Sequence, residues 1–516
     1  MAGEAGLRLR SIRTKRADTT GGSDYGDGEQ REPVTPAGRM FNQPIFDCYV
    51  ICIVGFKNMI DIPTIKTGLQ QTFVQHKRFS SIMEKDKHGS EYWVRTEVNL
   101  DDHIVVPLAS AMNLESDRRI EKYAAGLGLA PPLDRSRPLW EVHVLNFESA
   151  DAAASLILRL HHSLGDGISL MSLFLASTRS VANPDSLPSV RPGLNSNQKK
   201  AESMKGYIFL FWRMLIVIWC TLIEVGKFFL LLLGVKDSQT PLKGFSGVEH
   251  SPKSLYTGSI RMDDMRIVKN AVGGTVNDVF LGIISAGIRR YLEQHADEVS
   301  VHPSENQGNL IVNGARKATA GKVSGQQKCT DFLRIRATVL VNTRPKAGLQ
   351  ELASMMKGGS QARWGNNVGY VIIPMCVKHF DDPLDYIRKA KEVSDRKKYS
   401  LEAPFSYASG QLVMKLFGAK AAANLTYRSV LHTTLSISNM IGPLEEVMFM
   451  GNPITYIVPT SYGQAQSLCI HLQTYMGKAK LVVTVAKDII PDPDVLLQHI
   501  LDALKDMKQA ACARGH

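Results

Sequence analysis

The stretch His161-His162-Ser163-Leu164-Gly165-Asp166-Gly167 places an HHxxxDG pattern at the end of a short apolar segment. Ahead of this pattern, leucines alternate with other residues: Leu156, Leu158 and Leu160 form one set, and Ile157, Arg159 and His161 form the other. This period of two predicts a strand over residues 155–162 that runs into a turn. Neighbouring side chains on a strand point to opposite faces, so the two histidines cannot share one site. His162 falls on the leucine face and is the candidate catalyst, whereas His161 falls on the arginine face and is the candidate packing partner.

His162 has the chemistry of a general base. A hydroxyl group is a poor nucleophile at neutral pH, and a base within hydrogen-bond reach accelerates its attack by roughly 10² to 10⁴. An imidazole has an unperturbed pKa of about 6.5, so it is largely neutral near pH 7 and can accept a proton. Gly167 either leaves room beside this base for a substrate or is a simple turn glycine. The alternative for the whole pattern is a core histidine pair followed by Asp166 as a helix cap.

Six further segments accompany the HHxxxDG pattern along the chain: Glu32-Pro33-Val34-Thr35-Pro36 ahead of Met40-Phe41, Pro138-Leu139-Trp140-Glu141, Thr275-Val276-Asn277-Asp278-Val279, Val341-Asn342-Thr343-Arg344, Asn366-Asn367-Val368-Gly369 and Ser438-Asn439-Met440-Ile441-Gly442-Pro443. Together they resemble the CoA-dependent acyltransferase superfamily and, more narrowly, the plant-type wax ester synthase/diacylglycerol O-acyltransferase family. The DFGWG signature of the plant alcohol acyltransferases does not occur in the sequence, which favours the wax ester branch.

The resemblance implies an α/β (α+β) fold with two domains of the chloramphenicol-acetyltransferase type and an active site in the channel between them. It implies transfer of a fatty acyl group from acyl-CoA to a long-chain alcohol, with diacylglycerol as a secondary acceptor. His162 would take the proton of the acceptor hydroxyl as its oxygen attacks the thioester, and would return a proton to the CoA sulfur. Acyl-CoA would be a substrate, with no other cofactor and no metal.

The resemblance also implies roles for residues outside the strand. Asp166 would be the structural partner of an arginine, for which Arg344 is the candidate. Asn277 and Asp278 would belong to the active-site region, although either could simply cap the helix that follows them. Asn439 would line the channel between the domains, or would only end a strand in a turn.

Composition shifts divide the chain into residues 1–31 as a disordered segment, 32–190 as a first domain, 191–250 as a linker with an apolar helix and 251–516 as a second domain. The expected elements of the two domains are a helix over 62–75, a strand over 91–98, a helix over 279–292, strands over 333–343 and 368–374, and a closing helix from about Pro493. Trp140 is expected in the core.

The apolar run over about 207–233 is long enough to cross a bilayer core of about 30 Å. Three charges interrupt it, Arg213, Glu224 and Lys227, and on a helix they fall within a single narrow stripe. Such a helix can lie in the membrane interface, cross the membrane with its stripe against protein, or pack between the enzyme's own domains. Interfacial attachment fits the stripe best.

The net charge of +12 suits both anionic lipid headgroups and the phosphates of CoA, and no nucleic-acid motif accompanies it. Two basic runs, 388–391 and 396–398, form either a binding patch or a solvated helix face. Seven scattered cysteines indicate neither a disulfide framework nor a zinc site, so we expect a reducing compartment. The cytosolic face of the endoplasmic reticulum membrane is the expected location, with the plasma membrane as an alternative. The sequence leaves the oligomeric state open.

Two other classes of function use the same fold. A condensation-type enzyme would use the histidine to form an amide from carrier-bound substrates, but the carrier modules that normally accompany it are missing here. A non-catalytic lipid-binding homologue would be expected to have lost the histidine or its companions. Both are present, so catalysis is preferred.

Overall fold

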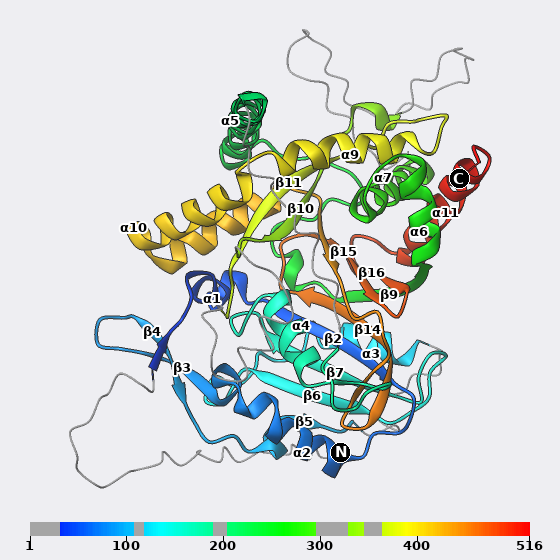
Figure 1. Ribbon diagram of the computed structural model, residues 1–516. Helices are drawn as coiled ribbons and strands as arrows, with labels where there is room; N and C mark the ends of the chain where they lie inside the picture. Colours follow the sequence, from blue (N-terminus) through cyan, green and yellow to red (C-terminus); the bar gives the residue numbers. More distant parts are fainter. Residues whose placement is uncertain (1–30, 108–117, 189–203, 296–328, 345–363, 516) are drawn as a thin grey trace, which may run out of the picture.

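Two large sheets, each covered by helices, form the body of the protein in the computed structural model, which describes residues 31–107, 118–188, 204–295, 329–344 and 364–515 (Figure 1). One sheet has seven strands and the other six, and a small third sheet has three. The mixed α/β architecture with two domains that the resemblance implies is therefore confirmed. The predicted disordered segment lies almost entirely outside the described residues.

The seven-stranded sheet has the order β5-β6-β7-β2-β14-β13-β8 and carries the HHxxxDG pattern. The bounds of its strands are β2 Tyr49–Phe56, β5 Ile104–Val105, β6 Trp140–Leu145, β7 Ala154–His161, β8 Arg179–Ser180, β13 Val447–Phe449 and β14 Asn452–Tyr462. The central strand β7 is buried along its whole length. The predicted strand over 155–162 is confirmed within one residue.

Two strands of this sheet, β13 and β14, come from the second half of the chain. β14 pairs antiparallel with β2, with Tyr462 opposite Tyr49, and lies beside it in the lower half of Figure 1. The two sheets therefore do not divide the chain as the predicted domain boundaries do. A segment that completes a distant sheet carries the same period of two as a local strand, so the sequence alone does not assign it to either sheet.

The six-stranded sheet has the order β11-β10-β12-β15-β16-β9. Its strands are β9 Lys253–Arg261, β10 Ile335–Asn342, β11 Val368–Met375, β12 Leu435–Met440, β15 Leu468–Tyr475 and β16 Lys478–Ala486. One hydrophobic core fills the space between this sheet and its helices α6, α7, α9 and α11, which have the bounds Met262–Ala271, Val276–Gln294, Asp385–Lys398 and Pro493–Cys512. The strands and helices predicted for the second domain are present at nearly the predicted bounds.

The remaining elements are shorter or peripheral. The small sheet consists of β1 Arg31–Pro33, β3 Ser81–Lys85 and β4 Glu91–Arg95. The helices that precede α5 (Met204–Leu232) along the chain are α1 Pro36–Phe41, η1 Pro44–Phe46, α2 Ile62–Gln71, η2 Phe73–Gln75, η3 Lys77–Ser80, η4 Leu100–Asp102, α3 Arg119–Gly126 and α4 Gly167–Ala176. Those that follow α5 and are not yet given are η6 Val248–His250, η8 Cys329–Phe332 and α10 Glu402–Leu431. Trp140 is buried, and its indole N–H donates to the Phe79 carbonyl, so it belongs to the core as predicted.

The apolar run forms one helix, α5 (Met204–Leu232), whose two ends have different surroundings. Near its carboxyl end, Glu224 is fully buried, and its carboxylate accepts hydrogen bonds from Arg396 and Lys397 of α9. Toward its amino end, large apolar side chains such as Trp212 and Trp219 are exposed. Only part of α5 therefore packs on the protein.

The basic runs on α9 do not form a free cationic patch. Each of their charged side chains pairs with a carboxylate; the pairs are Arg388 with Asp382 and Asp385, Lys389 with Glu392, Lys391 and Lys398 with Asp395, and Arg396 and Lys397 with Glu224. The expectation of a binding patch is therefore not supported here. Most of these acids lie one helical turn away on α9, a spacing that the sequence itself contains, whereas the pairs with Glu224 join α9 to a distant helix and could not be predicted.

Candidate active site

The HHxxxDG pattern forms the connection between β7 and α4. β7 ends at His161, and the backbone N–H of His162 still donates to the Cys48 carbonyl at 2.8 Å, beside the end of β2. α4 begins at Gly167, with Asp166 as its N-cap, because the Asp166 carboxylate accepts from the Ser169 backbone N–H at 2.9 Å. The strand end and the helix start therefore fix the backbone on both sides of His162.

His161 is held by hydrogen bonds on both ring nitrogens. Its Nε2 lies 2.9 Å from the Asp47 carboxylate, which also accepts from the Tyr49 hydroxyl at 2.9 Å. Since a carboxylate only accepts, Nε2 carries the proton and Nδ1 accepts from the Ser163 hydroxyl at 2.6 Å. These contacts fix the orientation of the His161 ring, which lies on the face of the strand opposite His162.

His162 occupies a different environment, at the wall of an apolar cavity. Its ring stacks on Phe41, with centroids 4.3 Å apart and planes at 28°. Nδ1 is buried and has no hydrogen-bond partner among the described residues. Burial lowers the pKa of His162 below its ordinary value of 6.5, although the neighbouring Asp166 carboxylate opposes part of this effect. The imidazole is therefore neutral at pH 7 and able to accept a proton.

This lowered pKa predicts the pH dependence of any reaction in which His162 accepts a proton. The neutral form is lost only as the pH falls through a value below 6.5, so kcat/KM should stay level near pH 7 and decline on the acid side of pH 6.5. A pH profile measured between mildly acidic and neutral buffers tests this. An acid limb centred above pH 6.5 would contradict the assignment.

The cavity beside His162 lies between the two halves of the molecule and has about 940 Å³ of empty space, its open mouth included. Its walls come from α1, β10, β11, β12 and both ends of α10. Most of the lining side chains are apolar, among them Met40, Phe46, Leu340, Met414 and Val430. A cavity with apolar walls and a neutral base can hold a hydrocarbon chain whose polar end lies at the base.

Asp166 forms an ion pair with Arg344, the partner expected for it. Nη2 of Arg344 lies 2.8 Å from Oδ2 of Asp166, and both side chains are buried. The same carboxylate oxygen accepts from the Asn367 backbone N–H at 2.9 Å. Asp166 therefore joins the HHxxxDG turn of the first half to β10 and β11 of the second half.

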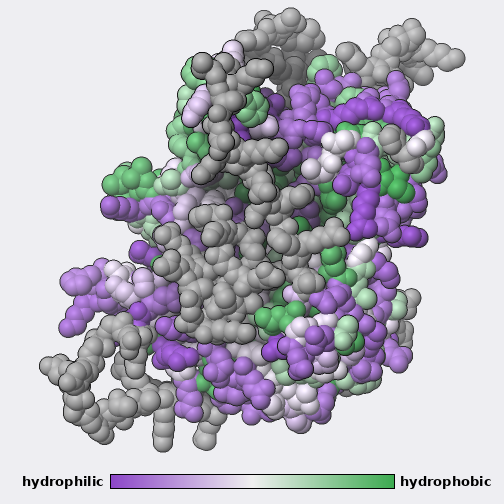
Figure 2. Space-filling model, in the orientation of Figure 1, coloured by the Kyte–Doolittle hydropathy of each residue, from purple (hydrophilic) through white to green (hydrophobic). Residues whose placement is uncertain are grey.

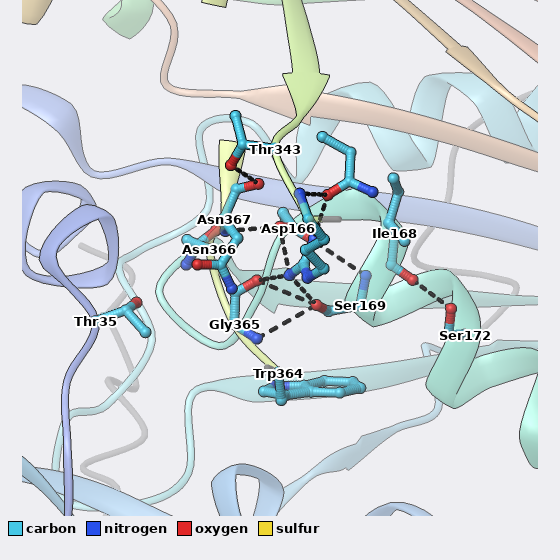
Figure 3. A network of polar contacts seen from close by, with 12 residues as sticks. Thr35, Asp166, Ile168, Ser169, Ser172, Thr343, Trp364, Gly365, Asn366 and Asn367 are labelled. Carbon is cyan, nitrogen blue, oxygen red and sulfur yellow. Dashed lines mark hydrogen bonds and ion pairs between the residues drawn. The ribbon is translucent and has the colours of Figure 1, made fainter. Parts of the chain in front are cut away.

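Asn366 contacts the HHxxxDG turn directly, and its function was not assigned from the sequence. Its side-chain amide donates to the His162 carbonyl at 2.9 Å, and the Trp364 indole N–H donates to the Leu164 carbonyl at 3.1 Å. Figure 3 shows Trp364 and Asn366 beside the turn that holds Asp166. The guanidinium of Arg78, which is buried, donates to the same Leu164 carbonyl at 3.1 Å. The one signal in the sequence was the Asn366-Asn367 pair directly ahead of a strand.

Asn277, Asp278 and Asn439 lie together at the start of α7 and are not among the residues that line the cavity. Asp278 is in a capping box, in which its carboxylate accepts from the Thr275 backbone N–H, so the capping alternative describes its contacts. The Asn439 amide donates to the Asn277 side chain. On β12 the residue that lines the cavity is Ser436, and side chains alternate along a strand, so Asn439 belongs to the helix-covered face. Gly167 borders Met440, and a Cβ there would lie 3.3 Å from its sulfur.

Comparisons with known proteins agree on one family. Residues 64–280 match the family described as "Wax ester synthase/diacylglycerol acyltransferase catalytic domain", and residues 364–508 match "WS/DGAT C-terminal domain". The chain is 37% identical to wax ester synthase/diacylglycerol acyltransferase 6 of Arabidopsis thaliana over 528 residues, covering 98% of each chain. It is 38% identical to wax ester synthase/diacylglycerol acyltransferase 5 of the same plant over 520 residues, covering 97% of this chain and 98% of that one.

A solved structure shows the same fold. The wax ester synthase/diacylglycerol acyltransferase from Marinobacter aquaeolei VT8 superposes with a TM-score of 0.57 at 17% identity, covering 93% of this chain and 99% of that one. The fold, the family matches and the relatives over nearly the full length thus lead to one conclusion: this chain belongs to the wax ester synthase/diacylglycerol acyltransferase family.

Proposed function

We propose that this enzyme transfers a fatty acyl group from acyl-CoA to the hydroxyl of a long-chain alcohol to form a wax ester, and that it acylates diacylglycerol as a secondary activity. The observation that carries the proposal is the neutral, buried His162 at the wall of a largely apolar cavity between the two halves. Ester formation of this kind is also what the names of the Arabidopsis relatives describe. Acyl-CoA is a substrate, and the proposal requires no other cofactor.

The proposed reaction needs one base and no redox step. The hydroxyl oxygen of the acceptor attacks the thioester carbonyl and the new C–O bond forms, while His162 accepts the hydroxyl proton. The C–S bond then breaks, and His162 returns the proton to the departing CoA sulfur. Asp166 does not relay this proton, because its carboxylate is engaged by Arg344 and by two backbone N–H groups.

A competition assay identifies the acceptor. Membrane-fraction enzyme is incubated with radiolabelled palmitoyl-CoA, hexadecanol and diacylglycerol together, and the labelled lipids are separated. We expect label mainly in wax ester, with less in triacylglycerol. Label mainly in triacylglycerol would reverse the order of the acceptors, and no labelled lipid product would contradict the proposed reaction.

We also propose that α5 attaches the enzyme to a membrane from one side without crossing it. Phe209–Leu232 is long and apolar enough to span a bilayer. However, Glu224 near its carboxyl end is fully buried against α9, so this end is tied to the protein. The free part, residues 207–220, precedes the contact of Thr221 with α10 and is about 21 Å long at the ordinary helical rise, whereas the bilayer core is about 30 Å thick. This part is too short to cross the core, and it fits a helix that lies in the interface of one leaflet.

The topology of the membrane attachment can be tested with tags on the two chain ends. If α5 enters one leaflet only, both ends lie on the cytosolic face of the endoplasmic reticulum membrane, which is the location we propose. Protease added to intact microsomes should then remove an N-terminal and a C-terminal tag equally. Protection of one tag until detergent is added would show that α5 crosses the bilayer.

A further inference from the structure

The long helix α10 reverses its course at Gly418 and exposes an apolar end. Gly418 has a φ of 82°, a backbone conformation that favours glycine, and it separates two helical halves. Next to it, Leu416 and Phe417 are 62% and 71% exposed. In Figure 1 the two halves extend together from the body of the protein, and Figure 2 shows the hydrophobic end on the same side of the molecule as α5. We call residues 412–420 the α10 tip.

The charges around the α10 tip are all positive. Lys415 and Lys420 flank Leu416 and Phe417, and all four side chains are exposed. The single acidic residue of α10 is Glu402, which lies at the opposite end of the first half and is ion-paired with Lys397. An exposed apolar surface bordered by lysines is complementary to a lipid leaflet with anionic headgroups, which attract each lysine.

The inner side of α10 lines the cavity of His162. Gly410, Gln411 and Met414 of the first half and Ala422 and Thr426 of the second half are among the lining residues. Met414 is buried, yet it lies within one helical turn of the exposed Phe417. Each half of α10 therefore has one side at the cavity and another at the surface of the molecule.

α10 is also joined to the membrane helix proposed above. The Leu401 backbone N–H, at the N-cap of α10, donates to the Thr221 hydroxyl of α5 at 3.0 Å. Phe228 of α5 packs edge-on against Phe405 of α10, with ring centroids 5.8 Å apart. These contacts fix the base of α10 to the packed end of α5, so both helices can meet one lipid surface.

We propose that the α10 tip inserts into the leaflet that holds α5, and that lipid acceptors pass along α10 from the membrane to His162. This inference rests on the proposed function, because it names the route by which the acceptor reaches the base. A lipid surface is the occupant of the α10 tip, and a second copy of this chain is the alternative occupant that the experiments below distinguish from it.

Insertion is measured with tryptophan at the α10 tip. In the variant Phe417→Trp, vesicles of phosphatidylcholine and phosphatidylserine that contain a brominated lipid should quench the added fluorescence. The matched variant Met59→Trp, at an exposed position in the loop between β2 and α2, should show no such added quenching. Equal fluorescence of Phe417→Trp with and without the brominated lipid would overturn the proposal.

Delivery of the acceptor is measured with the double variant Leu416→Asp/Phe417→Asp, beside the control Met59→Asp. Since burial of each apolar side chain contributes substantially to insertion, activity toward hexadecanol in vesicles should fall at least roughly tenfold, whereas activity toward hexanol in solution should not change. Unchanged activity toward hexadecanol would overturn the proposed route. A wild-type enzyme that esterifies neither alcohol would contradict the proposed function instead. If the double variant converts a dimer to a monomer and the Phe417→Trp variant shows no quenching by the brominated lipid, the tip is assigned to a second copy of the chain.

Discussion

Replacing His162 with alanine is expected to lower kcat for ester formation by roughly 10² to 10⁴, the contribution of a general base. Acyl-CoA binding should remain close to that of the wild-type enzyme, because the apolar walls of the cavity come from other residues. Both quantities can be measured on the purified variant, kcat with labelled palmitoyl-CoA and hexadecanol, and binding by equilibrium titration with palmitoyl-CoA.

The matched control is His103→Ala. His103 is buried and stacks on Trp140, with centroids 4.1 Å apart, much as His162 stacks on Phe41. It lies in the first domain and does not line the cavity. We expect this control to lose some stability and to keep its kcat. Equal loss of activity in the two variants would show that removal of a buried histidine, and not of the base, is responsible.

Replacing Arg344 with methionine should cause the largest loss of stability. The Asp166 carboxylate would remain buried with its backbone donors but without its cation, and breaking a buried ion pair from one side costs about 3–5 kcal/mol. Because two backbone N–H groups still solvate Asp166, we expect a value near the lower limit, read as the change in the free energy of unfolding in a denaturant titration. The turn that carries His162 should also lose its fixed position, so kcat falls.

Two further variants distinguish the effect of the buried Asp166–Arg344 pair from the effect of removing any arginine. Arg266→Met removes an exposed arginine that pairs with Asp263 at 2.6 Å, and such a surface pair contributes at most about 1 kcal/mol. Adding Asp166→Asn to Arg344→Met removes the unpaired charge and should restore part of the lost stability. An Arg344→Met variant as stable as the surface control would mean that the ion pair does not hold the two halves together.

The strand that leads into the HHxxxDG pattern could be predicted because its alternating side chains are neighbours in the sequence. The period of two before His161 placed the two histidines on opposite faces, and the structure gives them different surroundings: Asp47 and Ser163 for His161, and Phe41 for His162. The pair of Asp166 with Arg344 was reached through the family resemblance. Spacing alone does not join residues so far apart in the chain.

The features that the sequence did not predict depend on contacts between segments that lie far apart in the chain. The Asn366 side chain binds the His162 carbonyl across the domain boundary, and an isolated pair of asparagines has many other uses. The pairing of β14 with β2 of the first sheet could not be predicted for the same reason, because the two strands lie far apart in the chain. Asn277 and Asn439 were expected in the active-site region. Asn439 instead contacts Asn277 at the start of α7, because its side chain lies on the helix-covered face of β12, and the sequence does not show which face that is.

The most direct test of the account is the release of CoA thiol from palmitoyl-CoA by the wild-type enzyme and by His162→Ala, each with and without hexadecanol. If His162 is the base for direct attack by the alcohol, the wild-type enzyme releases thiol only when hexadecanol is present, in an amount equal to the ester formed. The variant then releases almost none. Equal thiol release without the alcohol, or equal release by the variant, would contradict the account.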